Sequence, residues 1–429
     1  MSDLPRRLLL TGFVYLAATI ALVVSRAPLG SASFFVCLGV ATAAYLVVLP
    51  AAWRAPEAPR RLLVTAFLFA LAFRVPLALS PVGPDSDMVR YLWDGRVQHF
   101  GYNPYTVVPA DASLAHTHTE QSRQMPSRHD RTPYPPAAQL FFRLVVGIHD
   151  STLAMKLALV ACDVLTIIVL WRWLSSIGRS PWLALVYAWN PLVILEIAHG
   201  GHIDALGALW MTASAYFLAR RRRTLASIAF VLAIATKLLP IVLAPLYWKR
   251  IGWKDGVLAG LVLAAMYALF IVGTSVPLGN LPNVVYLRFN GPVFRTIAAL
   301  GPPQIAAVVA VLLGLGAAAW ARARRGSSDP AAWAWPMAAS LACAPVIYPW
   351  YLLYFTPFLW SRATGPLLAW TLSAVPVYVV WERTRHGGRW IVPFSVEAME
   401  YGCVVAAAIV LVLLARRQAA RGAPTAELR

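Results

Sequence analysis

Two aspartates, Asp85 and Asp87, stand one residue apart near the start of a polar stretch, residues 81–149, that lies between apolar runs. An ionised carboxylate can act as a general base for a hydroxyl group within hydrogen-bond reach. A second carboxylate beside it can orient the base, bind sugar hydroxyls or help to hold a divalent cation. The spacing alone also fits solvated residues or a helix N-cap. The polar stretch is therefore a candidate catalytic or recognition segment.

The residues after this pair predict a short helix followed by a turn. Residues 88–101 carry aromatic and apolar side chains on one face and end at a glycine, and residues 103–105 read Asn-Pro-Tyr. Arg90 and Asp94 stand four residues apart, which favours pairing between them over substrate contact. The later histidines, His116, His118 and His129, lie in a Ser/Thr/Gln-rich run without a carboxylate in matching register. We expect a mobile loop there and no metal site.

The composition indicates an integral membrane protein. The chain of 429 residues is 59% hydrophobic and 13% charged, whereas soluble domains carry about 25% charged residues. The formal net charge of +19 raises the question of nucleic acid. The basic residues, however, cluster in short loops between apolar runs, which is the positive-inside pattern of membrane proteins. We therefore exclude a nucleic-acid partner. The four cysteines are scattered through apolar runs and form no metal-binding motif.

The apolar runs predict roughly a dozen membrane spans with the C-terminus in the cytoplasm, since a span needs about 20 apolar residues. We expect one transmembrane domain, 1–429, with a first helix at 8–25 that is a span and no cleaved signal peptide. The charge pattern puts 81–149 on the extracytoplasmic face and makes 276–301 a second outer loop. The predicted spans are 8–25, 33–52, 62–80, 152–174, 181–198, 205–219, 256–275, 302–322, 331–347, 363–381 and 398–415, with a short returning segment at 350–361.

The segment 224–248 is too short for two spans, yet basic residues flank it on both sides. Lys237 and Pro240 interrupt its apolar run. Two half-helices that meet near Lys237 fit the length, and such broken backbone is tolerated where it faces protein or a wet cavity. A single span that places Lys249 outside is the alternative.

Several motifs, taken in order, resemble a known superfamily. They are the Asp-x-Asp pair, RYLWDGR at 90–96, GYNPY at 101–105, TPYPP at 132–136, HGGHID at 199–204, KLLP at 237–240 and YPWY at 348–351. The set is similar to that of GT-C superfamily glycosyltransferases, above all the bacterial polyprenol-phosphate-mannose-dependent α-mannosyltransferases. It resembles more loosely the catalytic subunit of GPI mannosyltransferase I.

This resemblance implies a GT-C-type helix bundle with a large first extracytoplasmic loop, in the bacterial inner membrane and with its site facing the periplasm or exterior. It implies inverting transfer of a hexose, with mannose favoured, from polyprenyl phosphate to a lipid or glycan acceptor. Asp87 is then the expected base, with Asp85 next. Relatives often carry His where this chain has Tyr348, which puts an acid–base role there in question. We infer no metal and no other cofactor, although a divalent cation would be compatible.

A polyprenyl-phosphate donor needs cations at its phosphate. We expect Lys237, Arg288 and Arg295 in that role; membrane anchoring is the alternative for the arginines, and pairing with Asp163 or Glu196 for Lys237. The expected substrate contacts are Arg90, Tyr91, Asp94, Tyr105, Tyr134, His199, His202, Asp204, Asn290, Tyr348 and Trp350.

Two of these groups have structural alternatives. His199, His202 and Asp204 could hold zinc, but their double glycine favours a hydrogen-bonded cap at a helix start, and the resemblance places them at the border of the active-site cavity. Tyr348, Trp350 and Tyr351 either stack on a sugar or belong to the aromatic belt of the membrane interface.

Two other functions fit a polytopic chain. A transporter or flippase of a polar lipid or sugar should show internal pseudo-symmetry and polar residues at mid-membrane. Here the polar residues gather in one outer loop. A non-catalytic assembly subunit would keep its full function after Asp87 is replaced. The membrane glycosyltransferase is the interpretation that we carry to the structure.

Overall fold

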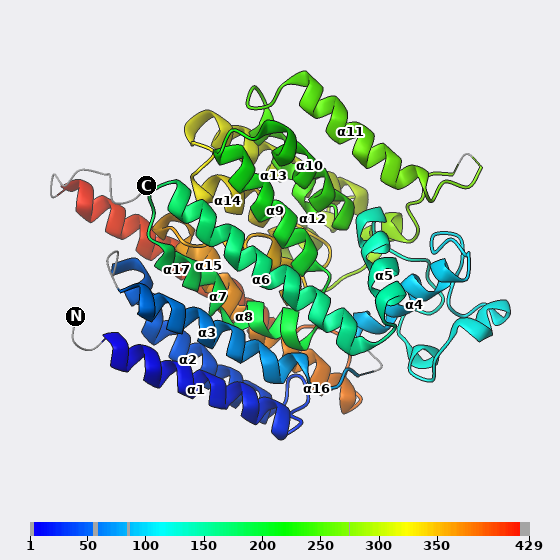
Figure 1. The fold of residues 1–429 in the computed structure, drawn as a ribbon, viewed down its shortest axis with the longest axis horizontal. Coiled ribbons are helices and arrows are strands. Elements are labelled where there is room, and N and C mark those ends of the chain that lie inside the picture. The colour runs from blue at the N-terminus through cyan, green and yellow to red at the C-terminus, as the bar shows by residue number, and fades with distance from the viewer. Residues whose placement is uncertain (1–3, 55–58, 84–85, 274, 421–429) are drawn as a thin grey trace.

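The computed structural model describes residues 4–54, 59–83, 86–273 and 275–420, and the regular elements in these ranges are helices (Figure 1). Among the described residues, seven helices are long and apolar enough to cross a membrane, or eight if one bent pair counts as a span. This confirms the prediction of an all-α polytopic membrane protein. The seven are α1 (Leu4–Val24), α2 (Ala32–Arg54), α3 (Arg60–Ala78), α6 (Thr152–Ser176), α13 (Pro303–Arg324), the continuous stretch Arg362–Arg385 and α17 (Phe394–Ala420).

The predicted dozen spans were too many. Three of the predicted spans form shorter helices, α9 (Asp204–Ala219), α11 (Trp253–Ala268) and α14 (Pro330–Ala342), of 16, 16 and 13 residues. Most residues of α9 and α14 are buried against other helices. An apolar run therefore fills the interior of the bundle as readily as it crosses a membrane, and hydropathy alone does not separate the two.

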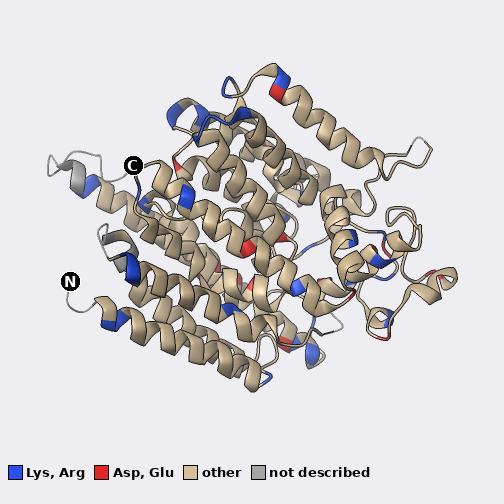
Figure 2. Cartoon of the chain, viewed as in Figure 1, with Lys and Arg blue, Asp and Glu red and all other residues tan. Residues whose placement is uncertain are grey.

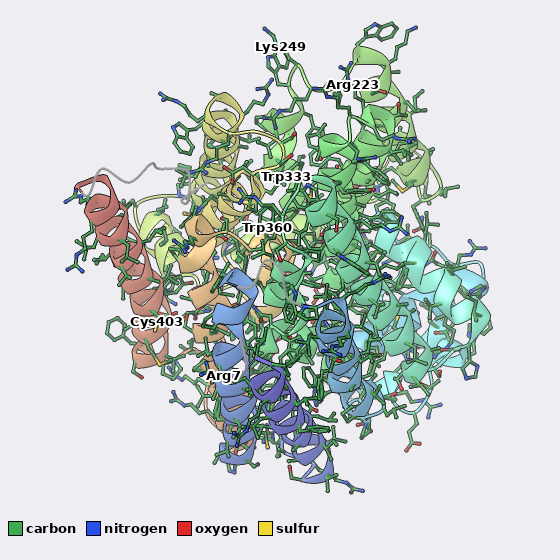
Figure 3. The ribbon with its side chains drawn as sticks, turned by 60° about the vertical axis from the view of Figure 1, so that its left-hand side comes forward. Arg7, Arg223, Lys249, Trp333, Trp360 and Cys403 are labelled. Carbon is green, nitrogen blue, oxygen red and sulfur yellow. The ribbon has the colours of Figure 1, made fainter. Side chains whose placement is uncertain are left out.

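The segment 224–248 returns to the end of the bundle at which it starts. It consists of α10 (Arg223–Thr236), an extended residue at Lys237 and the 3₁₀ helix η5 (Leu239–Tyr247). Thr224 Oγ1 donates a hydrogen bond of 2.5 Å to Asp255 at the start of α11, so both ends of the segment lie side by side. Figure 3 shows Arg223 and Lys249 at the same end of the molecule. The structure therefore has the predicted pair of half-helices.

The polar stretch 81–149 folds into a cap at one end of the bundle (Figure 1). It contains α4 (Asp87–His99), η1 (Ala112–Thr117), η2 (Ser122–Gln124) and α5 (Pro136–Ile148), and α4 packs on α5. The predicted second outer loop contains η6 (Leu281–Tyr286) and α12 (Pro292–Ala298). The two loops touch, because Asn280 N donates to Thr132 O over 3.1 Å.

Figure 2 shows most lysines and arginines along the edge of the bundle that runs from the chain termini to the start of α11. The cap around α4 and α5 lies away from that edge and carries charges of both signs. The positive-inside rule associates such a basic edge with the cytoplasm.

Candidate active site

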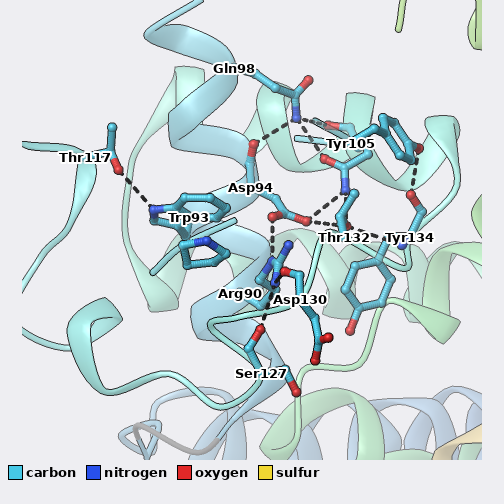
Figure 4. Close-up of polar contacts among 12 residues, drawn as sticks. Arg90, Trp93, Asp94, Gln98, Tyr105, Thr117, Ser127, Asp130, Thr132 and Tyr134 are labelled. Carbon is cyan, nitrogen blue, oxygen red and sulfur yellow. Dashed lines mark hydrogen bonds and ion pairs between the residues drawn. The ribbon is translucent and has the colours of Figure 1, made fainter. Parts of the chain in front are cut away.

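A buried polar network holds α4 in place and so positions the residues at its start. Asp94 has no exposed surface and accepts hydrogen bonds from Arg90 Nε at 2.6 Å, from Thr132 Oγ1 at 2.6 Å and from Gln139 Nε2 at 2.8 Å (Figure 4). Arg90 also donates to the carbonyl of Asp130 over 3.0 Å. Arg90 and Asp94 therefore pair with each other, as their spacing favoured, and connect α4 to the loop before α5.

Asp87 is the first residue of α4, and Ser86 before it is the N-cap. The side chain of Asp87 keeps 37% of its surface exposed. Burial raises the pKa of Asp87 to about 6, and the nearby Lys237 ammonium opposes that rise. A carboxylate with this pKa is ionised at neutral pH and is a stronger base than an ordinary aspartate. Asp85 lies outside the described residues.

The segment with the double glycine packs directly against the start of α4. Gly201 has a φ of +68°, and a Cβ atom there would lie 1.8 Å from the Met88 side chain. Only glycine therefore allows this approach. The predicted cap at the start of α9 is wrong, because Ile203 occupies that position without a side-chain hydrogen bond. The glycines bring His202 next to Asp87 instead.

His202 lies between two carboxylates. Its Nδ1 is 3.8 Å from Asp87 Oδ2, and its Nε2 is 3.4 Å from Glu196 Oε2. The side chain of Glu196 is 1% exposed, and Tyr378 Oη donates to its two oxygens at 2.7 and 2.8 Å. Glu196 belongs to the π-helical turn Leu195–His199. Such turns occur frequently at functional sites.

A second ion pair lies beside this group. Lys237 Nζ is 2.7 Å from Asp204 Oδ1 and 3.8 Å from the centre of the Tyr351 ring. Lys237 therefore pairs with Asp204, neither with Asp163 nor with Glu196 as the alternative prediction had it. Its side chain is 23% exposed, while that of Asp204 is 1% exposed. The break between α10 and η5 thus places a partly accessible cation at the site.

Stacked aromatic rings support His202. The Trp350 ring stacks on His202 at 4.0 Å and on Tyr348 at 4.4 Å. Tyr348 in turn contacts Phe289 of the second outer loop at 4.5 Å. Trp350 is buried. The Trp350 ring stacks on protein rings and not on an open surface. Its position therefore matches neither of the two expected roles, which were stacking on a sugar and membership of an interface belt.

Three predicted tyrosines of the cap contact one another or the segment of His202. Tyr91 Oη accepts a hydrogen bond from Ile203 N over 3.4 Å, which joins α4 to the segment of His202. Tyr134 packs edge-on against Tyr91 at 5.0 Å. Tyr105 Oη donates to the carbonyl of Tyr134 over 2.7 Å.

Three predicted residues lie in other surroundings. Arg295 forms a two-point ion pair with Glu397 at 2.8 and 2.6 Å, and Arg288 donates to carbonyls of its own loop. Asn290 is buried and donates to Glu400 over 2.9 Å. His199 ends the π-helical turn that also holds Glu196 and lies close enough to His202 to help lower its pKa.

Three cations were predicted to bind phosphate. Of these, Lys237 is the one that contacts the cluster of carboxylates formed by Asp87, Glu196 and Asp204, through its ion pair with Asp204.

The sequence analysis did not select three buried polar residues of this region. They are Glu196, Tyr378 and Lys156, whose Nζ donates to the carbonyls of Leu77 and Ser80 over 3.0 and 2.8 Å. An ionisable residue inside an apolar run is the signal that identifies Glu196 and Lys156. Tyr378 gives no such signal. In the described ranges, no group of three or more His, Cys, Asp and Glu side chains is arranged to hold a metal ion.

Ionisable residues gathered beneath a polar cap in a helical membrane bundle mark a candidate functional site. A family model described as alpha-(1->6)-mannopyranosyltransferase, N-terminal domain, matches residues 12–250, more than half of the chain. The chain belongs to this family and is a GT-C-type, multi-pass membrane mannosyltransferase, which favours the enzyme over a transporter or flippase. Comparison with curated proteins gave no match, and neither did comparison with solved structures.

Proposed function

We propose that the protein transfers mannose from a polyprenyl-phosphate donor to a hydroxyl group of a lipid or glycan acceptor. The transfer inverts the anomeric carbon, takes place on the extracytoplasmic side of a bacterial inner membrane and uses Asp87 as the general base. The whole chain acts as one catalytic unit, because Tyr348 and Trp350 lie beyond the matched residues 12–250 and still contact the site.

The accessibility of three neighbouring carboxylates carries this proposal. The side chains of Glu196 and Asp204 are each 1% exposed, whereas that of Asp87 is 37% exposed. A general base must reach the hydroxyl that it deprotonates. Asp87 is the member of this group that an acceptor can touch, and its pKa of about 6 leaves it ionised at neutral pH.

In the proposed reaction, the acceptor oxygen attacks the anomeric carbon while the bond from that carbon to the phosphate oxygen breaks. Asp87 takes the hydroxyl proton. The family is named for alpha-(1->6)-mannopyranosyl transfer, and inversion with an α-linked product requires a β-linked donor. Lys237 contacts the leaving phosphate, since its ammonium is partly exposed and lies close enough to lower the pKa of Asp87.

The charge distribution supports the proposed sidedness. The edge of the bundle that carries most lysines and arginines lies away from the cap (Figure 2), and the positive-inside rule associates such an edge with the cytoplasm. The proposal needs no metal ion, because Lys237 supplies the positive charge at the phosphate.

The test of the donor uses purified protein in proteoliposomes with radiolabelled polyprenyl-phosphate mannose and, in parallel, a nucleotide-activated mannose. We expect transfer to a lipid extract from the lipid-linked donor alone, and no loss with a chelator. Transfer from the nucleotide donor, or a requirement for added cation, would contradict the proposal. Protease access to the cap in oriented vesicles tests the sidedness.

A further inference from the structure

The segment between the last two predicted spans, residues 381–393, is basic although it lies on the side of the bundle that carries the cap. Its charged and titratable members are Arg383, Arg385, Arg389, His386 and one acid, Glu382. Trp381 and Trp390 of the segment pack against Phe289 of the second outer loop at 6.0 and 5.6 Å, and that loop touches the cap. Under the positive-inside rule, loops away from the basic edge carry few arginines. This cluster is an exception that needs a local cause.

A double-glycine turn brings two of these arginines together. The turn follows α16 (Val379–Arg385), and Gly387 in it has a φ of +79°, which reverses the chain. Gly388 N then donates to the carbonyl of Arg383 over 2.8 Å, and a Cβ atom at Gly388 would lie 2.8 Å from that oxygen. The side chains of Arg383 and Arg389 therefore start from neighbouring positions of the backbone.

The loop after α1 adds a third arginine. The single acid of the segment pairs with Arg385, which also donates to the carbonyl of Leu29 over 2.6 Å, so this loop lies against α16 (Figure 1). Arg26 belongs to the same loop and is exposed. Within the part of the chain that the structure describes, the side chains of Arg26, Arg383 and Arg389 form no hydrogen bond or ion pair. Three exposed positive charges thus lie on this side without a described acid to balance them.

The segment lies at the level of the lipid headgroups. It leads directly into α17, whose stretch Phe394–Arg417 has 24 residues, of which 6% are buried. Such a stretch is about 36 Å long and crosses a hydrocarbon core of about 30 Å. Phe394 is 82% exposed, and Ile391 and Trp390 just before it are 56% and 41% exposed. Tryptophan and arginine beside exposed apolar side chains are typical of the membrane interface.

We propose that Arg26, Arg383 and Arg389 bind the headgroup of an anionic phospholipid in the leaflet on the side of the cap. A guanidinium group can donate two parallel hydrogen bonds to phosphate oxygens. Three unbalanced charges favour a lipid with net negative charge over a zwitterionic one. Ile391 and Phe394 lie where the acyl chains of that lipid begin. This inference goes beyond the proposed function.

The lipid site borders the candidate active site without belonging to it. Trp390 packs on Trp381 at 4.6 Å, and the Trp381 ring lies 6.3 Å from each of the Tyr348 and Trp350 rings. The phosphate contact proposed for the donor is Lys237, which pairs with the buried Asp204. The three arginines of the lipid site are instead exposed. A bound lipid therefore contacts the surface behind the stacked rings and takes no part in the transfer.

The experiment measures lipid binding to the full-length protein by native mass spectrometry, with phosphatidylglycerol and phosphatidylcholine of the same acyl chains. Wild type should bind its first phosphatidylglycerol at least about 10-fold more tightly than phosphatidylcholine. Each arginine near a lipid surface contributes about fivefold in affinity. We therefore expect Arg383→Gln with Arg389→Gln to weaken phosphatidylglycerol binding by about 10–25-fold and phosphatidylcholine binding by less than about threefold.

The matched control is Arg220→Gln with Arg222→Gln, which removes the same charge from exposed positions between α9 and α10. Its affinity for phosphatidylglycerol should stay within about twofold of wild type. An equal loss in this control would reduce the effect to net charge and overturn the proposal. Equal affinity of wild type for the two lipids, or an unchanged affinity for phosphatidylglycerol in the Arg383/Arg389 variant, would overturn it as well.

A transfer assay separates this site from a substrate site. In vesicles of phosphatidylcholine alone, the Arg383/Arg389 variant should keep the wild-type KM for polyprenyl-phosphate mannose and for the acceptor. A raised KM there would assign these arginines to a substrate and overturn the proposal. The binding titration uses no activity, so its result stands even if the proposed donor is wrong.

Discussion

The replacement of Asp94 by Ala should destabilise the cap strongly. Asp94 is buried and accepts hydrogen bonds from Arg90, Thr132 and Gln139, all of 2.8 Å or less. The side chain of Arg90 is 8% exposed, so Asp94→Ala leaves a buried guanidinium without its carboxylate. Breaking such a pair costs about 3–5 kcal/mol. Because α4 begins at Asp87, the cap and the base should lose their order together.

The assay is unfolding in detergent, followed by tryptophan fluorescence, with limited proteolysis of the cap as a local measurement. Glu120→Ala, at an exposed cap residue, is the control and should change stability by less than about 0.5 kcal/mol. Replacing both partners, Arg90→Met with Asp94→Leu, should recover most of the loss, because no buried charge then remains unpaired. A loss below about 1 kcal/mol for Asp94→Ala, or no recovery in the double variant, would refute the reasoning.

Three further outcomes follow from the site. The pKa of about 6 for Asp87 predicts that kcat/KM is level above that pH and falls about tenfold per pH unit below it, because only the ionised base works; a pH–rate profile that stays level through pH 5 would contradict this. Lys237→Met should lower kcat/KM by about 10–100-fold with part of the loss in donor KM, since a contact to charged phosphate contributes about 1.5–3 kcal/mol; Lys237→Arg should lose less, and equal losses would argue against a phosphate contact. Arg295→Gln should lower the free energy of unfolding by about 1–3 kcal/mol, because it leaves the buried Glu397 without its partner. A raised KM for the donor at an unchanged free energy of unfolding would instead make Arg295 a ligand of the donor.

The sequence predicted the parts of the fold that depend on local patterns. The membrane character, the helix after Asp87 and the broken segment at Lys237 all follow from composition, periodicity and length. The number of spans does not follow from these patterns, because the short apolar helices α9 and α14 are buried by other helices. Burial inside a bundle and burial in lipid require the same apolar residues.

The composition of the site was predictable only in part. Asp87, His202, Asp204 and Lys237 were selected and lie together. Glu196 and Tyr378, which complete this cluster, were not selected. Tyr378 lies 182 residues from Glu196 in the chain, so the sequence does not show that the two are neighbours. Trp350 shows the same limit. Its residue type fitted a sugar platform or an interface belt, while the structure places it against His202 and Tyr348. Such pairings depend on tertiary packing that one sequence does not specify.

The most direct test of the central claim is single-turnover transfer of mannose from polyprenyl phosphate by Asp87→Asn. Asn keeps the size of the side chain, and Ser86, not Asp87, caps α4, so the variant should fold. We expect a rate lower by about 10²–10⁴-fold with the donor still bound. Asp111→Asn, at an exposed cap residue, is the matched control and should transfer at the wild-type rate. Transfer by Asp87→Asn at the wild-type rate would show that the base is another residue.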